Sequence, residues 1–120
     1  MDSREIYAAL FDPRGPAGEP TGEWMYVGDA QSFNEQKFAS FIQQLDPTQP
    51  VLVAVSRTNA REVPMNMLAT VVPELLELGE VRMADTHFRR FMQVAPVGVA
   101  RAWSGRAQQA AAGDAGDPRA

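Results

Sequence analysis

Hydrophobic and polar positions follow two different periods along the chain, and these periods predict both strands and helices. Residues 6–11, IYAALF, are continuously apolar and stop at Asp12-Pro13, which predicts a short buried strand. Residues 13–22, PRGPAGEPTG, hold three prolines and three glycines and predict a long hairpin loop. The bulky residues of 23–29, EWMYVGD, then predict a second strand that pairs antiparallel with the first.

The clearest helical pattern covers residues 33–45. Ser32 and Glu35 have the spacing of a capping box, in which the hydroxyl and the carboxylate each satisfy a free backbone N–H at the helix start. Apolar residues then recur at helical intervals: Phe38, Phe41, Ile42 and Leu45. Asp46-Pro47 predicts the end of this helix.

The middle of the chain predicts a buried strand followed by helical structure. Residues 51–55, VLVAV, are apolar without alternation, as in a central strand covered on both faces, and their place after a helix predicts a parallel crossover. Asn59 and Glu62 have cap-like spacing for a further helix start. Pro64 precedes the apolar segment 65–78 and Pro73 interrupts it, which predicts one kinked helix or two short ones, ending at Gly79.

Short periods leave alternatives open in the last third of the chain. An alternating strand is predicted around Val81. For residues 86–92 we expect a short helix, with one long bent strand over 81–94 as the alternative, because so few residues do not separate the two periods. Residues 97–103, VGVARAW, predict a final strand whose valines and tryptophan face inward.

These elements predict one small domain over residues 1–104, of the α+β (or α/β) class. The expected order is ββαβα(α)β(α)β, with a mixed sheet of about four to five strands and about two or three helices. The length of 120 residues suits a single core. Residues 105–120 lack large apolar side chains and predict a disordered tail.

Composition excludes several classes of function. The chain has no cysteine, which removes disulfides, thiolate zinc sites, iron–sulfur clusters and cysteine nucleophiles. Neither the phosphate-loop motif nor the dinucleotide-binding glycine motif occurs, and we expect no cofactor. The apolar runs are too short for a signal-peptide core or a membrane span, so we expect a cytoplasmic protein with no membrane partner.

Charge is distributed unevenly around a net value of −4. Residues 1–50 hold eight acids against three bases, whereas residues 51–106 hold seven arginines against five acids. Such an asymmetry can steer association with a charged partner. Arginines and phenylalanines around Arg89 and Arg90 resemble the ingredients of a nucleic-acid surface, but the net charge is negative and no nucleic-acid-binding motif occurs. We therefore do not expect nucleic acid as a partner.

The candidate catalytic residues are few. His87 is the only histidine, and any imidazole base must use it, with Asp85 beside it. Asp12 and Asp29 fall at the ends of predicted strands, where α/β sheets often place functional carboxylates. No metal site is assigned, because the chain has no second histidine and no cysteine to complete one. Asp12, Asp85 and His87 are the catalytic candidates.

The candidate binding residues lie in three segments. Hydroxyls and backbone N–H groups after the central strand suit an anion, together with Arg57 and Arg61. Flexible thioethers beside a helix break suit a partner contact. A basic pair follows His87. The binding candidates are Arg57, Arg61, Met65, Met67, Arg89 and Arg90.

The absence of a catalytic motif favours a non-enzymatic, protein-binding or regulatory module. The expected class is a small inhibitor, immunity-like protein or adaptor of a bacterium or mobile element, with a protein partner or a second copy of itself. The alternative is a small metal-dependent hydrolase or nuclease, or an anion-binding enzyme, that uses the Asp and His groups named above.

Overall fold

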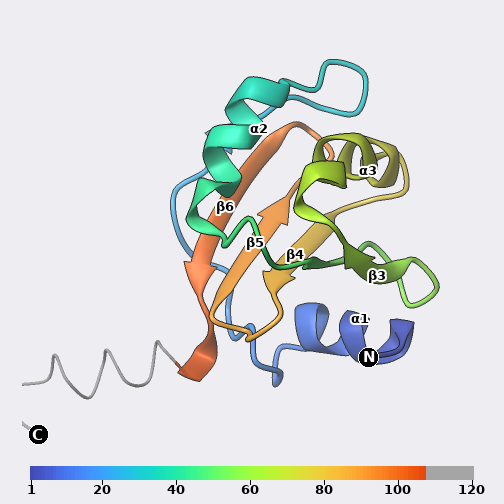
Figure 1. Cartoon of the computed structure of the whole chain (residues 1–120), viewed down its shortest axis with the longest axis vertical. Coiled ribbons are helices and arrows are strands. Elements are labelled where there is room, and N and C mark those ends of the chain that lie inside the picture. The colour runs from blue at the N-terminus through green and yellow to red at the C-terminus, as the bar shows by residue number, and fades with distance from the viewer. Residues whose placement is uncertain (108–120) are drawn as a thin grey trace, which may run out of the picture.

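An antiparallel sheet of six strands forms the centre of the structure, a computed structural model that describes residues 1–107 (Figure 1). The strands are β1 (Met25–Tyr26), β2 (Val51–Ala54), β3 (Ala60–Val63), β4 (Val81–Asp85), β5 (Arg90–Val94) and β6 (Val99–Ser104). They lie side by side in the order β1-β6-β5-β4-β2-β3. The prediction of a mixed sheet with a parallel crossover is wrong, because β2 is antiparallel to both of its neighbours, β3 and β4.

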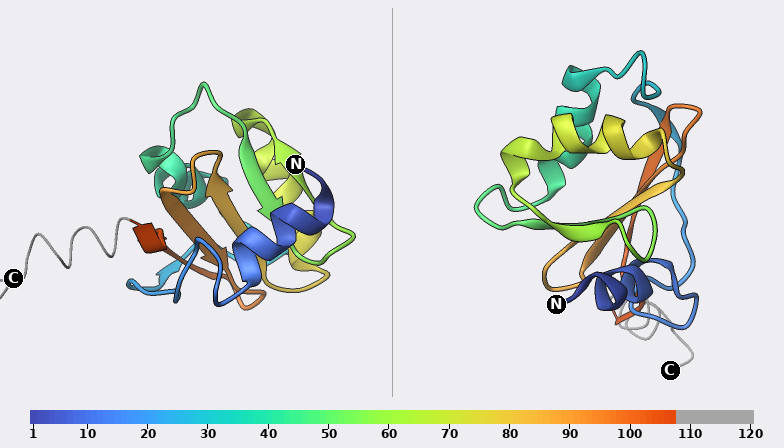
Figure 2. Two further views of the ribbon diagram at one scale, coloured as in Figure 1. Left: turned by 90° about the horizontal axis from the view of Figure 1, so that it is seen from below. Right: turned by 90° about the vertical axis from the view of Figure 1, so that its right-hand side faces the viewer.

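Helices pack on both faces of the antiparallel sheet and form a single α+β domain with it, but they cover the two faces unequally. Helix α1 (Ser3–Phe11) packs on β2, β3 and β4 from one side. Helices α2 (Glu35–Phe41) and α3 (Leu68–Leu76) lie on the opposite side, as the right-hand view of Figure 2 shows. Two short 3₁₀ turns adjoin these helices, η1 (Ile42–Gln44) after α2 and η2 (Met65–Met67) before α3.

The sheet separates two hydrophobic cores. The larger one lies under α2 and α3, and Phe38 and Leu68 are fully buried in it. The smaller one lies under α1, where Leu10 packs with Phe91 and Trp103. All residues of β2 are buried, as predicted for a central strand covered on both faces.

Residues 6–11 belong to helix α1, so the predicted strand there is wrong. The carboxylate of Asp2 caps the helix by accepting a hydrogen bond from the backbone N–H of Glu5 (2.9 Å). Ile6, Ala9 and Leu10 then form one buried face at helical spacing. A six-residue apolar run fits a strand and a buried helix face equally well. Here the Asp2 cap and the burial of one face against the sheet favour the helix.

Strand β1 pairs with β6 and with no strand at the N-terminus. Met25 lies opposite Ala100, and Tyr26 lies opposite Val99. The predicted hairpin is therefore wrong, although residues 12–24 do form an irregular connection without helix or strand. This connection leads from α1 on one half of the sheet to the opposite edge.

The predicted helix at 33–45 is confirmed as α2 and η1, with a different cap. The side chain of Asn34, not that of Ser32, accepts the hydrogen bond from a backbone N–H of the first turn (Lys37, 2.9 Å). The helix start predicted at Asn59 is wrong, because that residue closes the turn between β2 and β3. The segment after β3 is one 3₁₀ turn that continues into α3, with Pro73 inside the helix.

The helix predicted at 86–92 is also wrong, because these residues form the β4–β5 turn and the start of β5. Phe88 occupies the turn with φ of 56°, the only positive φ of a non-glycine residue in the described part of the chain. Trp103 faces inward as predicted, whereas Val97 precedes β6 and is 78% exposed. Residues 108–120 of the predicted tail lie outside the described residues. At the start of that predicted tail, the Gly105 N–H donates a hydrogen bond to the Arg89 carbonyl (2.8 Å), so this residue is joined to the domain.

Candidate functional site

Four predicted site residues come together in one depression, here called the β4–β5 hollow. It has a volume of about 300 Å³ and lies where β2 begins, β4 ends and β5 begins. Asp85, His87, Arg89 and Arg90 line it. The Arg90 guanidinium is held there by hydrogen bonds to the Gln44 side chain and to the Ser104 hydroxyl.

Asp85 has a structural role in this hollow. One carboxylate oxygen accepts hydrogen bonds from the backbone N–H groups of Arg89 and Arg90 (2.8 Å each), and the other accepts from the His87 N–H (3.2 Å). These bonds close the β4–β5 turn. Among residues 1–107, the hydrogen bonds to the Asp85 carboxylate come from these backbone N–H groups and none comes from the His87 imidazole.

Asp46 lines the same hollow, and the hydrogen bonds to its carboxylate can be tested through its pKa. The Thr48 hydroxyl (2.7 Å) and then the Thr48 backbone N–H (2.9 Å) donate to its carboxylate and hold the pKa of Asp46 below the ordinary value. The ionised form therefore contributes stability above the ordinary pKa, and this contribution is lost as the pH falls through the lowered pKa. We expect Thr48→Val to raise the pKa of Asp46, measured by NMR titration of the carboxyl carbon; an unchanged pKa would contradict this assignment.

A second, wider depression runs along helix α1 and is called here the α1 groove. It has a volume of about 740 Å³, and the predicted residues Asp12 and Arg57 line it together with Arg4 and Tyr7. Asp12 lies just after α1, and its carboxylate accepts a hydrogen bond from the Arg14 N–H (2.9 Å). Asp12 therefore does not end a strand, and it belongs to a different hollow from Asp85 and His87.

The remaining predicted residues are scattered. Arg61 is exposed on β3, Met65 packs partly against the larger core, and Met67 is 44% exposed. The Asp29 carboxylate accepts from two backbone N–H groups of its own turn. Within residues 1–107, no three His, Asp or Glu side chains are grouped so that they could hold a metal ion.

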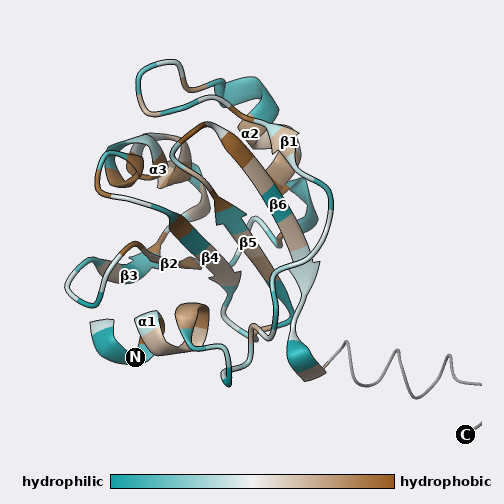
Figure 3. Ribbon diagram, turned by 180° about the vertical axis from the view of Figure 1, so that it is seen from behind, coloured by the Kyte–Doolittle hydropathy of each residue, from teal (hydrophilic) through white to brown (hydrophobic). Residues whose placement is uncertain are grey.

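Sequence reasoning missed a surface that the sheet itself creates. Because α1 packs mainly on β2, β3 and β4, it leaves most of β5, β6 and β1 without a helix over them on that side, as Figure 3 shows. We call this surface the open face. Its residues come from the edge strand, from β4 to β6 and from the segments beside them: Trp24, Tyr26, Glu80, Arg82, Gln93 and Arg101.

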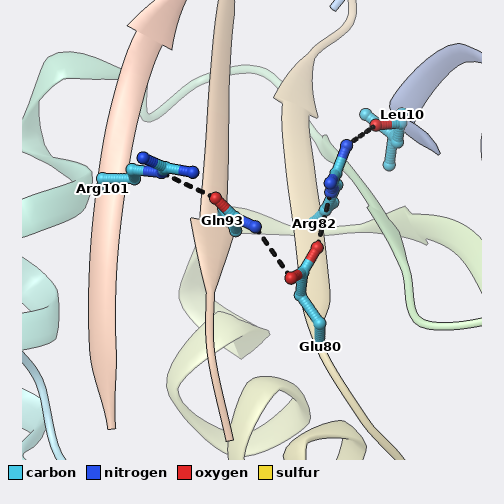
Figure 4. A network of polar contacts seen from close by, with 5 residues as sticks. All are labelled: Leu10, Glu80, Arg82, Gln93 and Arg101. Carbon is cyan, nitrogen blue, oxygen red and sulfur yellow. Dashed lines mark hydrogen bonds and ion pairs between the residues drawn. The ribbon is translucent and has the colours of Figure 1, made fainter. Parts of the chain in front are cut away.

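A chain of polar contacts crosses the open face (Figure 4). Arg101 donates to the Gln93 side-chain oxygen (2.8 Å), and the Gln93 amide nitrogen donates to Glu80 (2.7 Å). The other Glu80 oxygen forms an ion pair with Arg82 (2.7 Å), which also donates to the Leu10 carbonyl (3.0 Å). Gln93 is only 6% exposed. Both the oxygen and the nitrogen of its side-chain amide are hydrogen-bonded, and this fixes the orientation of the amide.

Aromatic rings lie against the two arginines of this chain. The Arg101 guanidinium lies 4.2 Å from the centroid of the Trp24 ring, and the Arg82 guanidinium lies 4.7 Å from that of Phe11. These are the distances of cation–π contacts. Two arginines against one glutamate leave the network with a charge of +1, on a chain whose net charge is −4.

The edge of the open face exposes three consecutive large side chains. Trp24 is 45% exposed, Met25 39% and Tyr26 51%. Lys37 of α2 reaches the Tyr26 ring (5.0 Å), so a second cation lies at this edge. The alternation of Val99, Arg101 and Trp103 places these residues on one face, but no pattern in the sequence indicates that Trp24 and Gln93 flank Arg101.

No family model, no curated protein and no solved structure matches this chain. Among residues 1–107, no helix is both long and apolar enough to span a membrane.

Proposed function

We propose that this chain is a protein-binding module and that the open face with strand β1 is its contact surface. The observation that carries the proposal is the exposure of Met25 and Tyr26 on the edge strand β1 and of Trp24 just before it, beside a part of the sheet that no helix covers. Adjoining large apolar side chains on a surface mark interaction sites more often than isolated ones do. Trp, Tyr and Arg are also the residues that most often dominate binding energy at interfaces.

The network across the open face supports the same proposal in a second way. Arg101 is held between Gln93 and the Trp24 ring, so it loses little side-chain freedom when a partner binds. The face carries net positive charge, and Lys37 adds to it at the edge. We therefore expect a partner surface that combines acidic groups with apolar side chains.

Removal of the two exposed rings is expected to weaken partner binding strongly. We expect tagged wild-type protein to retain a stoichiometric protein partner from its own cell lysate, less strongly at high salt. The double variant Trp24→Ala/Tyr26→Ala should weaken that complex about 30-fold or more, as loss of an interface hot spot does. Affinity purification with mass spectrometry identifies the partner, and titration calorimetry measures the affinity.

Two variants control this experiment. Met67→Ala removes a side chain of similar exposure at η2, and Arg61→Ala removes an exposed arginine on β3; both should bind like the wild type. Arg101→Ala should lose binding together with the ring variants. Retention of the partner by the double variant, with loss in Met67→Ala, would contradict the proposal and favour the thioether contact predicted from the sequence.

A further inference from the structure

One end of the α1 groove is built from two segments that are distant in the sequence. Arg4 and Tyr7 come from α1, and Arg57 and Thr58 come from the loop between β2 and β3. The Ser3 hydroxyl donates a hydrogen bond to the Arg57 carbonyl and so ties this loop to the start of the helix. The four lining side chains are therefore held beside one another by the fold.

The positive charge at this end has no anionic partner. Among residues 1–107, the ion pair of Arg82 with Glu80 is the only salt bridge, so Arg4 and Arg57 have none. The carboxylate that lines the groove, Asp12, lies eight residues beyond Arg4, about 12 Å along the helix axis, which is about one and a half Debye lengths at physiological salt. Asp12 thus neutralises little of the charge at the Arg4 end.

Stacking helps to position one of these two arginines. The Arg57 guanidinium lies 5.9 Å from the centroid of the Tyr7 ring, and Tyr7 stacks on Phe11 with centroids 4.7 Å apart and an interplanar angle of 16°. Phe11 in turn contacts Arg82. This column of two cations and two rings runs along α1 and restricts the orientation of Arg57 before any ligand binds.

All four side chains at this end carry hydrogen-bond donors: two guanidiniums, the Tyr7 hydroxyl and the Thr58 hydroxyl. Guanidinium groups bind phosphate oxygens through pairs of N–H donors, and two of them match the charge of a phosphate dianion. We propose that the Arg4–Arg57 end of the α1 groove binds a phosphate group. The site is separate from the open face and does not depend on the function proposed for it.

The test is a titration of the ¹⁵N-labelled protein with inorganic phosphate at constant ionic strength, followed by NMR. We expect saturable shifts at the Thr58 amide and at the Arg57 Nε–H. Arg4→Ala and Arg57→Ala should each weaken binding about tenfold, the effect of losing one charge-assisted hydrogen bond. Arg61→Ala, which removes an exposed arginine outside the groove, should bind phosphate like the wild type.

The comparison of ligands identifies the source of the phosphate. Tighter binding of O-phosphoserine than of inorganic phosphate would indicate a phosphorylated protein, whereas equal or weaker binding would indicate free phosphate. Linear shifts without saturation, equal shifts in Arg57→Ala, or equal binding of acetate would overturn the proposal. The double variant Trp24→Ala/Tyr26→Ala should bind phosphate normally, which keeps this site distinct from the open face.

Discussion

Substitution of Phe91 by alanine is expected to lower the free energy of unfolding by about 3–5 kcal/mol, the range for a buried phenylalanine. Phe91 is 1% exposed and lies between two other rings, with centroids 6.2 Å from those of Phe88 and Trp103. Its removal leaves a cavity in the smaller core, which the surrounding sheet cannot close. Urea denaturation followed by circular dichroism measures the change.

The smaller core is also what holds α1 on the sheet. In Phe91→Ala, backbone amides of α1 should therefore exchange with solvent faster than those of α3, which packs on the opposite face. Met67→Ala at an exposed position should change stability by no more than about 0.5 kcal/mol. A loss below about 1 kcal/mol in Phe91→Ala would mean that this core is not closely packed.

Gly28→Ala is expected to destabilise the protein by about 3 kcal/mol or more, because strain and steric overlap add. Gly28 has φ of +89°, which L-residues with a side chain rarely adopt. A Cβ atom there would lie 2.8 Å from the Asn34 nitrogen and 2.9 Å from the Phe33 Cα, and closer still to the Ser32 carbonyl. All three are backbone atoms of the turn between β1 and α2. Thermal and urea denaturation measure the loss.

Gly79→Ala separates the two causes. Gly79 also has a positive φ, +152°, but the nearest atom to its added Cβ is a Val55 methyl at 3.6 Å, an ordinary contact. This variant should therefore lose only about 1 kcal/mol, from backbone strain alone. Equal losses in the two variants would show that the turn at Gly28 adapts to a side chain.

The elements that could be predicted from the sequence are those whose signals are local and agree with each other. Residues 33–45 combine a cap, helical spacing and a terminating proline, and they form α2 and η1. Residues 51–55 are uniformly apolar, and β2 is buried along its whole length. In both segments, the signals within a few residues agree with the element that forms.

Other elements depended on the hydrogen bonds of a single nearby carboxylate and on the strands beneath, neither of which the apolar pattern shows. IYAALF became a helix because Asp2 caps it and the sheet buries Ile6 and Leu10. The stripe of Phe88, Phe91 and Met92 looked helical, but Asp85 collects three backbone N–H groups and closes a turn there. Phe91 and Met92 then point to opposite faces of the sheet.

The candidate sites divide in the same way. The sequence indicated individual residues such as Arg57, His87 and Arg90, and the fold placed them in two separate hollows. No local pattern in the sequence indicated the open face, because the neighbours of Arg101 come from the segment before β1 and from β5. Such a surface follows from the strand order β1-β6-β5-β4-β2-β3, which local patterns do not encode.

The position of residues 1–27 in the fold determines how long these residues lack their native contacts while the chain is synthesised. These residues supply both α1 and β1, yet α1 needs β4 beneath it, and β1 has no pairing partner until β6 has been made. Because synthesis proceeds from the N-terminus, Ile6 and Leu10 stay exposed until β4 has been added, and the Trp24–Tyr26 segment stays exposed until residues up to Ser104 have been added. Strand β1, the first strand to be synthesised, is thus the one that pairs only after β6, the last strand, has been made.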